Sequence, residues 1–140
     1  IIKYMNMKNL IICIALLFSC LIVRSQTASE ILKFNVVSAT PCKIGDNEII
    51  GETRFFKENQ ASIVFSGGIV VVIDKVNDLD LTFIITDKYY RNGAAVFETK
   101  DIKNGDITLV IVTEEDSIYT ISFIDSKTSL GFIYKTHLME

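Results

Sequence analysis

From residue 61 onward, apolar and polar residues alternate in short runs that are separated by turn sequences. These runs are rich in β-branched and aromatic residues, which are typical of β-strands, and none shows a sustained apolar stripe of helical period. Seven strands are therefore predicted: Ala61 to Ser66, Ile69 to Asp74, Leu79 to Tyr90, Ala94 to Thr99, Ile107 to Thr113, Ser117 to Asp125 and Gly131 to His137.

The turn sequences between these runs favour short hairpins. Gly-Gly and Asn-Gly pairs readily adopt the positive φ angles that two-residue hairpin turns require. Successive turn signals are about ten to fifteen residues apart, which is near the spacing of an all-β domain. The signals are Gly67-Gly68, Asn77-Asp78, Asn92-Gly93, Asn104-Gly105, Glu115-Asp116 and Lys127-Thr128.

Two earlier runs are less regular. Ile31 to Ser38 alternates weakly and is read either as a strand or as a helical turn that becomes one. Glu48 to Lys57 is predicted to be a strand with a bulge near Gly51. Pro41 lies between the two runs and is expected to separate them.

The fold class that follows is all-β, an antiparallel up-and-down meander of about eight strands. Such a meander either closes into a small calycin-like barrel or splits into a two-layer β-sandwich. The short sequential turns favour the barrel, because no long crossover of the Greek-key kind is present.

Two of the predicted strands are apolar on both faces, namely Ile69 to Ile73 and Leu109 to Val112. A strand of this kind needs cover on its second side from a terminal segment, a partner chain or a bound apolar ligand. In one interpretation Ile31 to Val37 supplies the cover. In the other a ligand does, and the candidate lining residues are Val70, Val72, Val110 and Val112.

The beginning of the chain has the layout of a secretory signal peptide. Lys8 precedes an apolar block about ten residues long, and small residues near Ser25 suit a signal peptidase. We therefore expect residues 1–25 to be a signal peptide that starts at Met5 or Met7. Residues 26–140 are expected to form a single domain, exported to the periplasm or secreted. The alternatives are a lipoprotein anchored through Cys20 and an uncleaved anchor helix.

Charge and cysteine content narrow the function further. Without Lys3, Lys8 and Arg24, the chain keeps 11 basic and 17 acidic side chains, a formal charge of −6. Since an acidic domain repels phosphate backbones, we expect no nucleic-acid partner. Beyond residue 25 the only cysteine is Cys42, which is expected to be a buried apolar residue, and no transmembrane span is expected.

Few residues carry candidate chemistry. An acidic turn formed by Asp74, Asn77, Asp78 and Asp80 is interpreted as a solvated hairpin tip rather than a calcium loop. His137 is the only histidine, too few for a zinc site of the usual kind. We therefore expect no metal, no cofactor and no catalysis. A hydrolase that uses scattered carboxylates is kept as a distant third function.

One further sequence is suited to recognition. Tyr89, Tyr90 and Arg91 precede a tight turn, and these residue types are enriched at protein interfaces. The sequence thus predicts an exported binding protein that carries a small apolar ligand. The alternative is a module that docks a protein through these three residues, as an inhibitor or a cell-envelope assembly component would.

Overall fold

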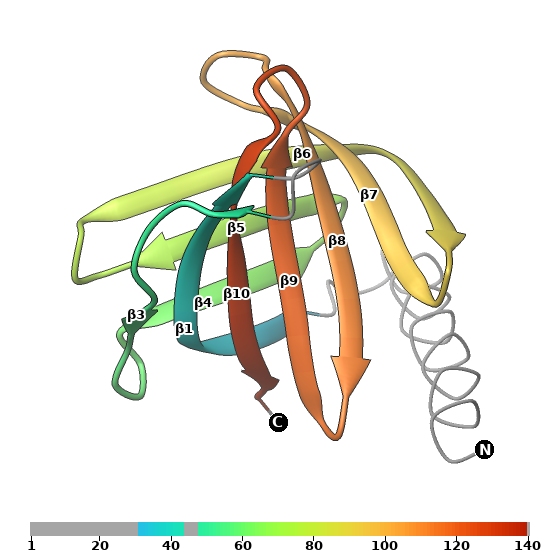
Figure 1. Cartoon of the computed structure of the whole chain (residues 1–140). Coiled ribbons are helices and arrows are strands. Elements are labelled where there is room, and N and C mark those ends of the chain that lie inside the picture. Colours follow the sequence, from blue (N-terminus) through green and yellow to red (C-terminus); the bar gives the residue numbers. More distant parts are fainter. Residues whose placement is uncertain (1–30, 44–47, 140) are drawn as a thin grey trace.

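The computed structural model describes residues 31–43 and 48–139, and every strand pairing among them is antiparallel (Figure 1). The ten strands are β1 (Ile31–Lys43), β2 (Glu48–Ile49), β3 (Arg54–Phe55), β4 (Ala61–Ser66), β5 (Ile69–Asp74), β6 (Leu79–Arg91), β7 (Ala94–Asp101), β8 (Ile107–Glu115), β9 (Ile118–Asp125) and β10 (Leu130–Leu138).

Eight of these strands form a closed barrel. Strands β4 to β10 pair in chain order, and β1 joins the two ends of this meander. It pairs with β4 through Ile31–Asn35 and with β10 through Phe34–Lys43. Closure leaves no unpaired edge among the eight strands, whereas β2 and β3 pair only with β1. The all-β prediction and its barrel option are therefore confirmed.

Strand β1 is longer than the sequence predicted. It continues through Pro41 to Lys43, so the first run does not end at Ser38, although the two runs still form separate strands. The carbonyl of Pro41 accepts a hydrogen bond from the Ile50 amide, so the side of the proline that lacks an N–H faces β2. The ladder with β10 on the other side keeps its hydrogen bonds, which is how an internal proline is tolerated. The predicted bulged strand from 48 to 57 is instead two separate two-residue strands.

The tight turns follow the glycine and asparagine signals. Asn92 and Gly93 have φ angles of 51° and 78°, and they connect the paired residues Arg91 and Ala94. The turn expected at Glu115-Asp116 lies one residue later, since Glu115 pairs with Ile118. Asp116 and Ser117 then take the two positive φ angles, 52° and 67°. These φ signs are those of the hairpin turn whose twist matches the flanking strands.

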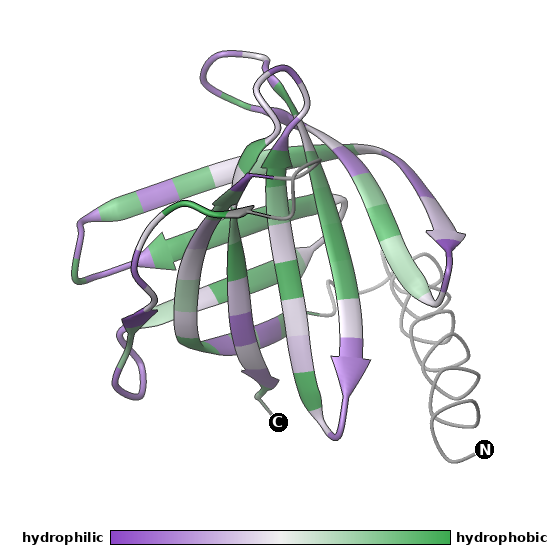
Figure 2. Cartoon of the chain, in the orientation of Figure 1, coloured by the Kyte–Doolittle hydropathy of each residue, from purple (hydrophilic) through white to green (hydrophobic). Residues whose placement is uncertain are grey.

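The interior of the barrel is filled by alternate residues of each strand. Val36, Ile63, Val70, Val110 and Ile121 are completely buried. Aromatic rings pack among them, as in the edge-on contact of Phe34 with Phe65, whose centroids are 5.8 Å apart. Figure 2 shows the resulting alternation of hydrophobic and polar positions, for example along β9. Full burial of each such apolar side chain stabilises the fold by about 1.5–3 kcal/mol.

The outward side chains of the doubly apolar strands are only half-buried. Ile69, Val71 and Ile73 on β5 all show partial exposure. The segment from Ile31 to Val37 does not cover them, because it is itself the start of β1 and part of the barrel wall. The proposed cover by this segment is therefore wrong.

The described residues include no helix long and apolar enough to cross a membrane. The predicted signal peptide at 1–25, with the alternative lipidation residue Cys20, lies outside the described residues.

Candidate functional site

One end of the barrel opens into a pocket with a volume of about 300 Å³, which we call the mouth pocket. It lies between β1, β10, the turn that joins β5 to β6, and the segment around β3. Its lining is mainly apolar, with a few polar groups. The lining residues are Ala39, Pro41, Glu52, Arg54, Phe56, Asp74, Asn77, Leu79, Leu81, Phe132 and Tyr134.

Strand register explains why these residues meet. Directly paired residues of an antiparallel sheet share a face. Asp74 pairs with Leu79, and Val72 with Leu81, at the end of the β5–β6 hairpin. Across the barrel, Ala39 pairs with Tyr134 and Pro41 with Phe132. The side chains of these pairs point to the inner side of the barrel at the end of the packed core. They therefore form the wall of the pocket.

Asp74 is a buried carboxylate in the wall of the pocket, with 8% of its surface exposed. Its Oδ1 accepts hydrogen bonds from the backbone amides of Val76 (2.9 Å) and Asn77 (3.0 Å), and its Oδ2 accepts one from the Asn77 side-chain amide. The carboxylate therefore holds the turn together. The expectation of a solvated tip is wrong for Asp74, although Asp78 and Asp80 are exposed as predicted.

Tyr134 places a hydroxyl group in the pocket. Its ring packs edge-on against Phe123, with centroids 5.5 Å apart, and the residue is 8% exposed. Burial, assisted by the negative charge of Asp74, raises the pKa of Tyr134 to about 12. No described residue hydrogen-bonds to this hydroxyl. It therefore stays protonated at neutral pH and is free to donate to a bound molecule.

Arg54 and Phe56 reach the pocket from the segment between β2 and β4. The amide of Phe56 donates to the carbonyl of Val37 (2.9 Å), which anchors this segment beside the bulge in β1. Phe56 is half-buried while its neighbour Phe55 is 76% exposed and lies outside the pocket. The exposed guanidinium of Arg54 forms no ion pair with any residue of the described ranges. It is thus available to an anionic group at the pocket rim.

The four valines predicted to line a ligand site all face the barrel interior. Val70 and Val110 are completely buried, and Val72 and Val112 are 2% and 6% exposed. Aromatic and aliphatic neighbours fill the space around them, and none of the four lines the mouth pocket. Val72 comes nearest, because it pairs directly with Leu81 of the pocket wall.

The three residues predicted to bind a protein partner do not share one face. Arg91 lies over the ring of Tyr89, 5.8 Å from its centroid, on the outer side of β6. Tyr90 points to the opposite side, where it pairs with Ala95, and it is 42% exposed. A partner that approaches from one side would therefore contact either Tyr89 and Arg91 or Tyr90.

Other candidate chemistry is sparse. Cys42 is buried with a free thiol, and burial raises its pKa. Within residues 31–43 and 48–139, no three His, Cys, Asp or Glu side chains gather in a way that would hold a metal ion. No family model matches the chain, and searches of curated proteins and of solved structures find no similar protein.

Proposed function

We propose that this chain is an exported, non-catalytic binding protein that carries a small, largely apolar molecule in the mouth pocket. One observation supports this most: a closed barrel ends in an open, mainly apolar pocket that contains the Tyr134 hydroxyl and the Arg54 guanidinium, neither of which has a partner among the described residues. Ligand sites typically combine apolar walls with a few convergent polar groups, and they often lie at the mouths of β-barrels.

The pocket suggests how such a molecule would lie. Its apolar part would contact Leu81, Phe56 and Phe132, which offer aliphatic and aromatic surface. An anionic head beside Asp74 would be repelled, so the head is expected at the rim near Arg54. The ligand class is therefore a small monocarboxylate, or a molecule of similar polarity, with an aromatic or aliphatic tail that fits about 300 Å³.

The hydrolase alternative has less support at this site. Glu52 and Asp74 both line the pocket, as a pair of catalytic carboxylates would. However, Asp74 accepts hydrogen bonds on both of its oxygens from the turn that it stabilises. A carboxylate held in this way is poorly suited to deliver a proton to a substrate.

A matched pair of phenylalanines tests the carriage proposal. The fluorescent probe N-phenyl-1-naphthylamine is titrated into the full chain and into the variants Phe56→Ala and Phe55→Ala. We expect saturable binding to the wild type, about tenfold weaker binding to Phe56→Ala, and binding within about twofold of wild type for Phe55→Ala. Equal affinities for all three proteins, or no saturable binding to the wild type, would overturn the proposal.

A second pair covers the case in which Phe56→Ala fails to fold. Phe132 is 49% exposed and lines the pocket, whereas the nearby Leu130 is 42% exposed and does not. Phe132→Ala should weaken probe binding and Leu130→Ala should not, while circular dichroism verifies that both variants are folded.

A further inference from the structure

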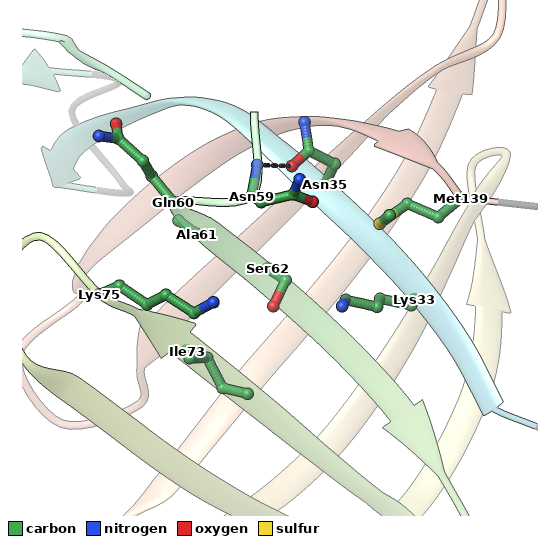
Figure 3. Close-up of a pocket in the computed structure, with 9 residues that line it drawn as sticks. All are labelled: Lys33, Asn35, Asn59, Gln60, Ala61, Ser62, Ile73, Lys75 and Met139. Atoms are coloured by element: carbon green, nitrogen blue, oxygen red, sulfur yellow. Dashed lines mark hydrogen bonds between the residues drawn. The ribbon is translucent and has the colours of Figure 1, made fainter. Parts of the chain in front are cut away.

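A second concave site lies on the outer wall of the barrel and shares no described lining residue with the mouth pocket (Figure 3). This outer groove has a volume of about 470 Å³ and is predominantly polar in its side chains. It is lined by Lys33, Asn35, Asn59, Gln60, Ala61, Ser62, Ile73, Lys75 and Met139. Its size is within the range of small-molecule sites.

The floor of the outer groove follows from strand register. Asn35 of β1 pairs with Ser62 of β4, which pairs with Ile73 of β5, so the three form an outward-facing row. Lys33 precedes Asn35 by two residues, and Lys75 follows Ile73 by two residues. In Figure 3 the ammonium groups of the two lysines point toward the Ser62 side chain from opposite sides.

Hydrogen bonds from backbone amides fix two amide side chains of the groove. The Oδ1 atom of Asn35 accepts a hydrogen bond from the Asn59 amide (3.2 Å), and the Oε1 atom of Gln60 accepts one from the Lys57 amide (2.8 Å). These two hydrogen bonds hold both amide groups at the edge of the groove, where in Figure 3 they point away from Ser62. The backbone around them is fixed, since the Lys75 amide donates to the Gln60 carbonyl at 2.9 Å.

Charge sets this groove apart from the rest of the molecule. The chain as a whole has a formal charge of −3, yet none of the described residues that line the groove carries a carboxylate. Neither Lys33 nor Lys75 forms an ion pair with a residue in the described part of the chain. Two acids lie beside the groove by register: the exposed Asp80 pairs with Ile73 on the outer face, and Asp74 pairs with Ala61 but is buried on the inner face. Two ammonium groups without a described ion-pair partner, one on each side of the Ser62 hydroxyl, form a site for negative charge.

We propose that the outer groove binds a small polar dianion, with Lys33 and Lys75 each contacting an anionic oxygen of it. The Ser62 hydroxyl, which lies between the two ammonium groups in Figure 3, would donate to an oxygen of the ligand. Among the residues that the structure describes, no aromatic side chain lines the groove, which disfavours sugar rings and nucleobases that bind by stacking. The ligand class is therefore a compact phosphate ester or dicarboxylate. This proposal is independent of the one for the mouth pocket, because the two sites share no described lining residue.

The test uses inorganic pyrophosphate and succinate as two probes at constant ionic strength. Each is titrated into the isotopically labelled full chain, and amide chemical shifts are followed by NMR. We expect saturable shifts at Asn35 and Ser62 with at least one probe. The probe that binds more tightly shows whether the groove prefers phosphate or carboxylate groups.

Lysine variants distinguish binding in the groove from non-specific attraction of the anion to positive charge on the protein. The double variant Lys33→Gln, Lys75→Gln should weaken binding by about tenfold or more. The control Lys100→Gln, Lys127→Gln removes the same charge from outside the groove and should stay within about twofold of wild type. Equal weakening in both double variants would overturn the proposal. So would the absence of saturable shifts with both probes at millimolar concentration.

Discussion

Replacing Tyr134 by phenylalanine should change how the stability of the barrel depends on alkaline pH. The substitution removes only the hydroxyl, and no described residue hydrogen-bonds to it. At neutral pH we therefore expect the free energy of unfolding to change by less than about 1 kcal/mol. The difference should emerge only where tyrosine begins to ionise.

The size of the effect follows from the two pKa values of Tyr134. Its pKa is about 12 in the folded protein, against an ordinary value of 10.0. Because the unfolded chain loses this proton first, stability is fully retained below pH 10 and falls as the pH rises from 10 to 12. Each pKa unit corresponds to about 1.4 kcal/mol, so the wild type should lose roughly 3 kcal/mol that the variant keeps.

Urea unfolding followed by circular dichroism at intervals from pH 8 to pH 12 measures this difference. Subtraction of the Tyr134→Phe curve cancels the titration of lysines and of the other tyrosines. Tyr89→Phe serves as the control and should retain the alkaline loss. A difference between wild type and Tyr134→Phe that stays constant from pH 8 to pH 12 would refute the argument that burial and Asp74 suppress ionisation.

Three further predictions concern packing and processing. A Cβ on Gly131 would lie 2.0 Å from the Phe123 carbonyl oxygen, so Gly131→Ala should lower stability by about 2 kcal/mol or more in thermal unfolding. The control Gly67→Asn, at a φ of 55° with open space around it, should change stability by less than about 1 kcal/mol. If both variants lost the same stability, the close approach of Gly131 to the Phe123 backbone would be contradicted. Ile121→Ala empties a fully buried site and should cost about 2–5 kcal/mol in urea unfolding, whereas a cost below about 1 kcal/mol would contradict a packed interior. The exported protein should have a mass that begins at Gln26, and an acylated Cys20 or an uncleaved chain would contradict the proposed signal peptide.

Local chemistry made most of the barrel predictable. Strands β4 to β10 follow from alternation between turns, because Gly67, Gly68, Asn92 and Gly93 suit positive φ angles. The closure of the barrel was not fixed by local pattern. It depends on the pairing of Phe34 with Leu138 and of the residues that follow, between opposite ends of the chain. The extension of β1 through Pro41 was not predicted either, because the effect of a proline depends on which edge of the strand it faces.

The mouth pocket was harder to foresee for two reasons. Arg54 and Phe56 belong to a segment with only two-residue strands, so alternation does not reveal which way their side chains point. Asp74 did carry a usable signal, since it continues the inward series of Val70 and Val72 at period two. Because the turn is rich in acidic residues, it was interpreted as exposed to solvent, and the inward position of Asp74 was missed.

The most direct test of the carriage proposal is a native mass spectrum of the protein, expressed with its own leader and recovered from the exported fraction. Wild type, Phe55→Ala and Phe56→Ala are compared from parallel preparations. We predict a reproducible small-molecule adduct on the wild type and on Phe55→Ala that is lost or strongly reduced on Phe56→Ala. An adduct of equal abundance on all three proteins, or on none, would contradict carriage in the mouth pocket.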